Sequence, residues 1–250
     1  MSKLFSIESG VPLADCSACA YRASLLPLDR CVPGDICVAA ESGRQIDRFF
    51  RHNPELARDY LADAFWERRA IAVRYAPVDS VHALVADPDE VVRRAIATRL
   101  PAEALQCLAR DPDREVRITV ASRLPAERLA EFIGDPDYMV RLQAAHRLPH
   151  GHLPRMAHDP DREVRKEVAR RLPAFALGRM MRDPDEEVRR IVAGRLLPED
   201  AAHLLADDDW LVRFGAAGQA PLAALTSLVD DPEPDVRNLV RRRLAEAERS

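Results

Sequence analysis

The sequence predicts an all-α fold in which a small cysteine-containing segment precedes a long solenoid of helical repeats. Three observations lead to this prediction. Aspartate returns every 24 residues from Asp87 to Asp231. Apolar residues keep fixed positions between these aspartates, and four cysteines lie ahead of the repeats, within the first forty residues.

The composition favours a folded, helical protein. Hydrophobic residues make up 47% of the chain and charged residues 31%, which is too apolar for a disordered chain. No segment approaches the roughly 20 apolar residues that cross a bilayer, and the first residues lack a basic region followed by an apolar core. Aromatic residues are only 5%, whereas Arg, Ala and Leu abound, which favours helices over strands. We therefore expect a cytoplasmic protein with no membrane contact.

The repeat begins with Asp-Pro in most units, and this dipeptide predicts a helix start. Asp is a good N-cap, and Pro suits the first helical position because no amide donor is needed there. With the Asp as position 1, apolar residues at positions 6, 10 and 14 form one stripe of a helix, as Val92, Ile96 and Leu100 show. A Pro at position 15 ends the helix. The first aspartates of the units are Asp87, Asp111, Asp135, Asp159, Asp183, Asp207 and Asp231.

A second, shorter helical element follows each Pro. Apolar residues at positions 19, 22 and 23, such as Leu105, Leu108 and Ala109, have spacings of three and four, which suit a short helix or a 3-10 turn. Neither element can bury its apolar face alone, so successive units must stack and share one core. Small alanines at position 11 fit this stacking, and Arg241 replaces them in the last unit, where we expect a charged capping helix.

The unit Asp-Pro-Asp-x-x-Val-Arg-x-x-Val-Ala-x-Arg-Leu-Pro-x-x-x-Leu-x-x-Leu resembles the leucine-rich repeat variant. The resemblance covers roughly Asp63 to the C-terminus and implies alternating α and 3-10 helices in two layers of a right-handed superhelix. The sequence departs from the pattern at Ala64, at Leu197-Pro198 and at Asp208.

The cysteine segment has the pattern C-x2-C-x11-C-x5-C, formed by Cys16, Cys19, Cys31 and Cys37. Structural disulfides are not expected in the cytoplasm, so four thiols in a segment with little core indicate a metal centre. Four-cysteine zinc sites usually use two C-x2-C pairs, whereas the wider second spacing also suits separate corners of a 4Fe-4S cube. The spacing alone leaves zinc and an iron-sulfur cluster as equal alternatives.

The resemblance extends to this segment, because leucine-rich repeat variant proteins of nitrogen-fixing bacteria join such an array to an N-terminal four-cysteine iron-sulfur domain. It implies that Cys16, Cys19, Cys31 and Cys37 are the four ligands of a 4Fe-4S cluster. We therefore expect an iron-sulfur domain over residues 1–45 and a solenoid over residues 46–250, with well-formed repeats from about residue 87. The resemblance also suggests a link with nitrogen-fixing metabolism.

Other candidate groups have simpler explanations. Cys107 lies at repeat position 21, where other units carry Glu131, Arg155 or His203, and we interpret it as an exposed thiol. The histidines between His146 and His152 lie near a turn without partners at ligand spacing. Arginines recur at positions 7 and 13 and could bind phosphates or an acidic partner. We favour internal ion pairs for position 7 and helix C-termini for position 13, because the net charge is -4.

The sequence carries no phosphate loop, nucleophile elbow or zinc-peptidase helix, so we do not expect an enzyme or a small-molecule substrate. The main hypothesis is a scaffold that binds an unidentified protein on the solenoid surface, with a redox- or iron-responsive cluster. The alternatives are an electron-transfer protein that docks through its solenoid and a nucleic-acid-binding protein that uses the arginine ladders.

Overall fold

The computed structural model describes residues 14–249, and every regular element in that range is helical. α-Helices alternate with 3-10 helices (η), and a single bridge between Val32 and Ile36 is the only β pairing in the described range. The all-α prediction and the alternation of the two helix types are therefore confirmed. The chain forms two compact units, Met1–Leu124 and Pro125–Ser250.

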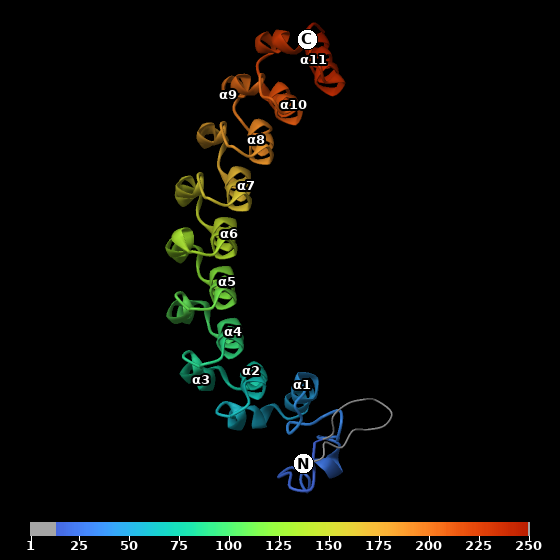
Figure 1. Ribbon diagram of the computed structural model, residues 1–250, viewed down its shortest axis with the longest axis vertical. Coiled ribbons are helices and arrows are strands. Elements are labelled where there is room, and N and C mark those ends of the chain that lie inside the picture. Colours follow the sequence, from blue (N-terminus) through green and yellow to red (C-terminus); the bar gives the residue numbers. More distant parts are fainter. Residues whose placement is uncertain (1–13, 250) are drawn as a thin grey trace. The chain divides into compact units, whose positions relative to one another are not determined.

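The first unit contains the cysteine segment and the first repeats. Its elements are η1 (Leu26–Leu28), α1 (Gly43–His52), η2 (Pro54–Tyr60), α2 (Trp66–Tyr75), α3 (Val78–Val81), η3 (His82–Leu84), α4 (Glu90–Arg99), η4 (Ala102–Leu108) and α5 (Arg114–Arg123). Helix α2 packs against both α1 and α4. Figure 1 shows α1 next to α2, and α4 stacked between α2 and α5.

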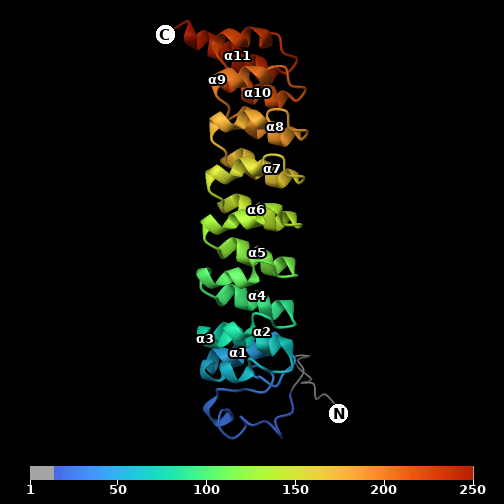
Figure 2. The same ribbon diagram turned by 90° about the vertical axis from the view of Figure 1, so that its left-hand side faces the viewer.

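The second unit contains the more regular repeats. Its elements are η5 (Ala126–Gly134), α6 (Tyr138–Arg147), η6 (His150–Met156), α7 (Arg162–Arg171), η7 (Ala174–Met180), α8 (Glu186–Ala193), α9 (Pro198–Ala201), η8 (Ala202–Leu204), α10 (Trp210–Gln219), η9 (Leu222–Leu228) and α11 (Pro234–Ala247). Within this unit the ten-residue α-helices form one layer and the 3-10 helices form a second layer (Figure 1), and successive repeats stack in register (Figure 2).

Each long helix begins two residues later than the Asp-Pro dipeptide predicts. Asp113, at position 3, is the N-cap of α5 and accepts hydrogen bonds from the N–H groups of Glu115 and Val116. The predicted cap, Asp111, is buried and accepts the N–H of Asp113 at 2.9 Å. The prediction that the position-1 aspartate caps the helix was wrong. The position-3 aspartate lies closer to the first turn of the helix, and the position-1 carboxylate is bound by an arginine of the preceding repeat.

The apolar stripe is the core, as its spacing predicts. In α7 the side chains at positions 6, 10, 11 and 14 are Val164, Val168, Ala169 and Leu172, all completely buried. The 3-10 layer adds apolar residues at positions 19 and 22, such as the fully buried Leu177. Because each helix is covered by its neighbours in adjacent repeats, the repeats share a continuous core within each unit.

The irregular sequence positions have local structural consequences. Helix α8 ends at Ala193, with Gly194 at its C-cap, and is two residues shorter than the regular helices. After the displaced Pro198 the next element starts as an α-helix rather than a 3-10 helix. At Asp208 the repeat is unaffected, because Asp209 still caps α10 through the N–H of Val212 at 3.0 Å. The final helix α11 is longer, with 14 residues.

Among the helices of residues 14–249, none combines the length and apolar character needed to span a bilayer.

Candidate metal centre

The first cysteine pair lies in a tight turn. The carboxylate of Asp15 accepts the N–H of Ser17 at 2.8 Å, and the carbonyl of Cys16 accepts the N–H of Cys19 at 3.3 Å. These bonds close the turn around the C-x2-C pair, as an Asx turn followed by a backbone turn does. Cys16 and Cys19 are both partly exposed and lie within one turn of each other.

The second cysteine pair flanks a short hairpin. Val32 and Ile36 exchange two backbone hydrogen bonds of 2.8 Å, and the N–H of Asp35 donates to the carbonyl of Val32. Pro33 and Gly34 occupy the turn between them, and Gly34 has a φ of 83°, which glycine adopts without strain. Cys31 precedes Val32 and Cys37 follows Ile36, so the hairpin places the third and fourth cysteines across from each other.

Three contacts hold this hairpin on helix α1. The N–H of Cys37 donates to the carbonyl of Gln45 at 3.3 Å. The side chain of Asn53, which is completely buried, donates to the carbonyls of Arg30 and Phe49, both at 2.8 Å. Arg48 of α1 also forms an ion pair with Asp35 of the hairpin. The cysteine segment is therefore fixed on the first helix of the array by backbone and side-chain bonds.

The four predicted ligands line one pocket. Cys16, Cys19, Cys31 and Cys37 all contribute to it. The remaining lining residues are mostly apolar and are Tyr21, Arg22, Leu26, Pro33, Ile36, Val38 and Phe49. The ring of Phe49 lies 5.4 Å from that of Tyr21, centroid to centroid. The segments before and after η1 thus meet at a common apolar cavity, as the prediction of a single four-cysteine site requires.

The electrostatics of the pocket oppose four free thiolates. Burial raises the pKa of Cys31, and the neighbouring thiolates of Cys19, Cys37 and Cys16 raise it further. Burial also raises the pKa of Cys37, although the N–H groups of Ala39 and Ala40 donate to its sulfur and lower that pKa in part. Like charges in a poorly solvated pocket resist ionisation, so four ligating thiolates need a compensating cation.

A zinc ion and an iron-sulfur cluster place different requirements on four cysteines. Tetrahedral zinc requires every sulfur about 2.3 Å from one point. A cluster binds each thiolate at a different iron, so its ligands surround a larger centre. In the range 14–249, no group of three or more Cys, His, Asp or Glu side chains is placed to hold one metal ion. The four cysteines line one pocket, which supplies the number of ligands that either centre needs.

Cys107 lies apart from this pocket, on η4. Its side chain is exposed, and its sulfur is 3.2 Å from the carbonyl of Ala104. The interpretation of Cys107 as an exposed thiol is confirmed.

Position-7 arginines are bound within the fold. Arg165, for example, donates from Nε and Nη2 to the two carboxylate oxygens of Asp183 and from Nη1 to the carbonyl of Asp159. The same bidentate pair joins Arg69 to Asp87, Arg93 to Asp111, Arg141 to Asp159, Arg189 to Asp207 and Arg213 to Asp231. The predicted ion pairs are confirmed, and each links one repeat to the next.

Position-13 arginines bind helix C-termini, also as predicted. Arg243 donates to the carbonyls of Ala217 and Ala220, both at 2.7 Å. Arg99, Arg123, Arg171 and Arg195 likewise bind carbonyls at the end of the preceding long helix. Carbonyls at a helix end lack intrahelical donors, and the guanidinium supplies them. These two sets of arginines therefore have hydrogen-bond partners within the fold.

Sequence analysis expected ion pairs for these arginines but did not specify that the position-1 aspartates are the partners. Asp87, Asp111, Asp159, Asp183 and Asp231 are among the buried charged residues, and the sequence also indicated them as helix caps. The signal was present, because an invariant Arg at position 7 and an invariant Asp 18 residues later occur together throughout the array.

The fold and the cysteine pocket define a helical repeat protein with an N-terminal four-cysteine domain. Residues 10–59 match the family model described as "LRV protein FeS4 cluster". Residues 114–137, 138–161 and 162–185 match the model described as "Leucine rich repeat variant". A solved structure described as a leucine-rich repeat variant with a novel repetitive structural motif is 58% identical, with a TM-score of 0.87. The match covers 94% of this chain and all of that one.

The chain belongs to the leucine-rich repeat variant family. A protein from Rhodobacter capsulatus, described as an uncharacterized 27.7 kDa protein in the nifB 3' region, is 42% identical over 87 residues. That match spans 35% of this chain and 35% of the relative, so the chain covers about a third of the relative's length. The family match favours an iron-sulfur cluster over zinc in the cysteine domain.

Proposed function

We propose that this protein is an interaction scaffold whose N-terminal domain holds a redox- or iron-responsive 4Fe-4S cluster through Cys16, Cys19, Cys31 and Cys37. One observation carries the ligand assignment. The four cysteines, drawn from a turn and a hairpin, line the same apolar pocket. The fifth cysteine, Cys107, is exposed on η4 and takes no part.

The residues of the domain have definite tasks in this proposal. The hairpin and the turn orient the thiols, and Tyr21, Ile36 and Phe49 keep water from the cavity. The N–H groups of Ala39 and Ala40 would stabilise negative charge on the Cys37 sulfur, which favours the reduced form. When bound, a cluster supplies one-electron chemistry or a response to iron supply. Since four protein thiolates leave no open iron site, we do not propose an enzyme.

The array supplies the scaffold part of the proposal. The position-7 arginines form ion pairs between successive repeats. These pairs make each unit a rigid support for exposed side chains. The Rhodobacter capsulatus relative is described as lying in the nifB 3' region, which supports a role connected with nitrogen fixation. A cytoplasmic location would keep the cysteines reduced before the cluster is inserted.

Electron transfer is the second candidate. Cys16, Cys19 and Cys31 are partly exposed, so an edge of the centre would lie near solvent, where a redox partner can approach. Protein-film electrochemistry of the loaded chain tests it. Reversible reduction is expected of a carrier, and a cluster that decays on the first cycle argues for a sensor or a structural centre.

The cluster is tested by anaerobic purification of the full chain. We expect a brown protein with a broad absorption band near ~400 nm and matching iron and acid-labile sulfide. Replacing Cys16, Cys19, Cys31 or Cys37 singly by Ala should remove most of the iron, and Cys107→Ala should leave it unchanged. A colourless protein with stoichiometric zinc would disprove the iron-sulfur assignment.

The scaffold is tested by cross-linking of the full chain in cells, with Cys16→Ala/Cys19→Ala as a cluster-free variant. If the protein is a scaffold, every variant with an intact array should keep its cross-linked partner. Loss of the cluster should change only the affinity for that partner. Partners that persist in variants with an altered array surface but are lost from the cluster-free variant, or no partner at all, would count against it.

A further inference from the structure

The 3-10 layer of the second unit carries a patch of basic side chains. Residues 138–158 and 168–182 contain no Asp or Glu. They include η6 and η7, whereas η5 carries Glu127 and Glu131. The same layer is therefore acidic in one repeat and purely basic in the next two.

Helix geometry directs these bases to solvent. A 3-10 helix has three residues per turn, so residues three apart share a face. In η6, Leu153 and Met156 are three residues apart and both buried, whereas Arg155, which lies between them in the sequence, is exposed. In η7 the buried pair is Leu177 and Met180, and Arg179 is exposed. His158 and Arg182, three residues after these arginines, are also exposed.

The two repeats contribute to one groove. His158, Arg179 and Arg182 line it, together with Asp159, Met180, Pro184 and the Arg165–Asp183 pair. The carboxylates of Asp159 and Asp183 do not neutralise the basic side chains at the rim of the groove, because each carboxylate is already bound by a guanidinium. Asp159 accepts two bonds from Arg141, and Asp183 accepts two from Arg165.

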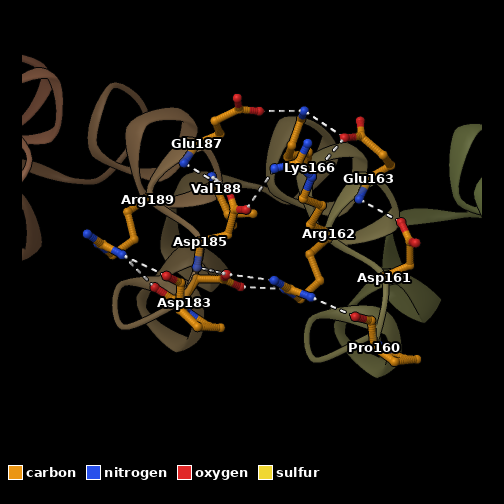
Figure 3. Close-up of polar contacts among 12 residues, drawn as sticks. Pro160, Asp161, Arg162, Glu163, Lys166, Asp183, Asp185, Glu187, Val188 and Arg189 are labelled. Carbon is orange, nitrogen blue, oxygen red and sulfur yellow. Dashed lines mark hydrogen bonds and ion pairs between the residues drawn. The ribbon is translucent and has the colours of Figure 1, made fainter.

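Arg179 and Arg182 at the rim have no acidic partner among the residues that the structure describes. Arg179 donates only to the carbonyl of Ala176 in its own helix. The α layer of the same repeats differs: Figure 3 shows Lys166 between Glu163 and Glu187, at 3.0 and 2.7 Å, and Arg162 near Asp185. Basic side chains are thus paired on one layer and unpaired on the other.

An exposed aromatic residue accompanies the bases. Phe175 lies on η7, four residues before Arg179, and is 78% exposed. No other large hydrophobic side chain in the described range is as exposed. Aromatic residues and arginine are the types most enriched at the centres of protein interfaces.

We infer that the basic patch, defined as Arg155, His158, Phe175, Arg179 and Arg182, binds an acidic segment of a partner protein that also presents an apolar side chain to Phe175. The inference rests on the proposed scaffold function and names the chemistry of its partner. A protein suits the patch better than nucleic acid, because the patch spans two repeats, has one aromatic side chain and belongs to a chain of net charge -4.

The test is fluorescence anisotropy with the full chain at roughly 0.15 M salt. The probes are a labelled peptide of Asp, Glu and Leu, the same peptide with Asn and Gln in place of the acids, and a short single-stranded oligothymidine. We expect the acidic peptide to bind and the amide peptide to bind at least about tenfold more weakly. Arg179→Glu/Arg182→Glu should weaken the acidic peptide at least about tenfold.

The matched control is Arg241→Glu/Arg242→Glu on α11, which makes the same charge change at two exposed positions outside the patch and should alter affinity less than about twofold. Phe175→Ala should weaken binding of the acidic peptide, and it should have no effect on a version of that peptide with Ala in place of Leu. If the charge reversals disturb folding, Arg179→Gln/Arg182→Gln replaces them.

Equal weakening by both charge-reversal variants, or no binding of the acidic peptide, would overturn the inference. Tighter binding of the oligothymidine, lost on Arg179→Glu/Arg182→Glu, would assign the patch to nucleic acid instead. The scaffold proposal survives either result, because cross-linking reports partners on any surface of the array.

Discussion

Arg213 binds Asp231 through two parallel hydrogen bonds, from Nε to Oδ2 at 2.7 Å and from Nη2 to Oδ1 at 3.0 Å. Its remaining nitrogen, Nη1, donates to the carbonyl of Asp207 at 2.9 Å. One guanidinium therefore holds the first residues of two successive repeats. Asp231 in turn accepts the N–H of Glu233, which shapes the turn before α11.

Removal of Arg213 should destabilise the protein strongly. Asp231 is only 4% exposed, and Arg213→Met would leave its charge buried without a partner. Breaking one side of such a pair costs about 3–5 kcal/mol. Arg213→Lys keeps the charge but cannot form two parallel bonds, so its cost should be intermediate. The free energy of unfolding is measured by urea denaturation, with Arg241→Met as an exposed control expected to change it by less than about 0.5 kcal/mol.

The free energy of unfolding should fall in acid as Asp231 becomes protonated. The Arg213 guanidinium holds the pKa of Asp231 below its ordinary value, although burial opposes the shift. For a carboxyl whose folded-state pKa is depressed, the stabilisation is complete above the unfolded pKa of about 4 and is lost as pH falls through the folded pKa. We expect a flat free energy of unfolding from pH 7 to about 5 and a steep decline below about 4.

The double variant Arg213→Met/Asp231→Leu isolates this contribution. It removes the shifted carboxyl, so its unfolding free energy should depend less steeply on pH below about 4 than that of the unaltered chain. Identical slopes for the two proteins would show that Asp231 does not contribute to acid unfolding.

The repeat elements were predictable because their determinants are local and recur every 24 residues. Val164, Val168 and Leu172 mark one helical face in the sequence and are buried in the structure. The helix start was not predictable from local rules, since Asp111 and Asp113 both satisfy the preference for an acidic cap. The choice depends on Arg93 of the preceding repeat, which binds Asp111 across the stack.

The candidate functional residues were also only partly predictable from the sequence. The four cysteines were found from their spacing, but spacing did not distinguish zinc from a cluster, because that depends on how Cys16 and Cys37 are placed in space. The arginines that look most suited to a ligand, those in regular ladders, are internal. Arg179 and Arg182 have no repeat equivalents of the same charge in the next unit and gave no periodic signal.

Gly34 should control the cysteine hairpin. Its φ of 83° costs an ordinary L-residue about 1–2 kcal/mol, and Asn tolerates it better. Gly34→Val should distort the turn that separates Cys31 from Cys37 and lower the iron content of anaerobically purified protein. Gly34→Asn should retain more iron than Gly34→Val. Equal iron content in the two variants would show that the turn does not position the thiols.

The alanine at position 11 should be essential inside the array and dispensable at its end. Ala169 is completely buried in α7, which packs against both α6 and α8. Ala169→Leu forces three extra carbons into a filled space, and overpacking of this kind costs about 1–3 kcal/mol. Arg241 occupies the same position in the last repeat and is exposed, so Arg241→Leu should change the free energy of unfolding by less than about 0.5 kcal/mol. Urea denaturation followed by circular dichroism compares the two. A similar loss in both variants would mean that stacking between repeats does not select the small residue, and Ala169 would then need another explanation.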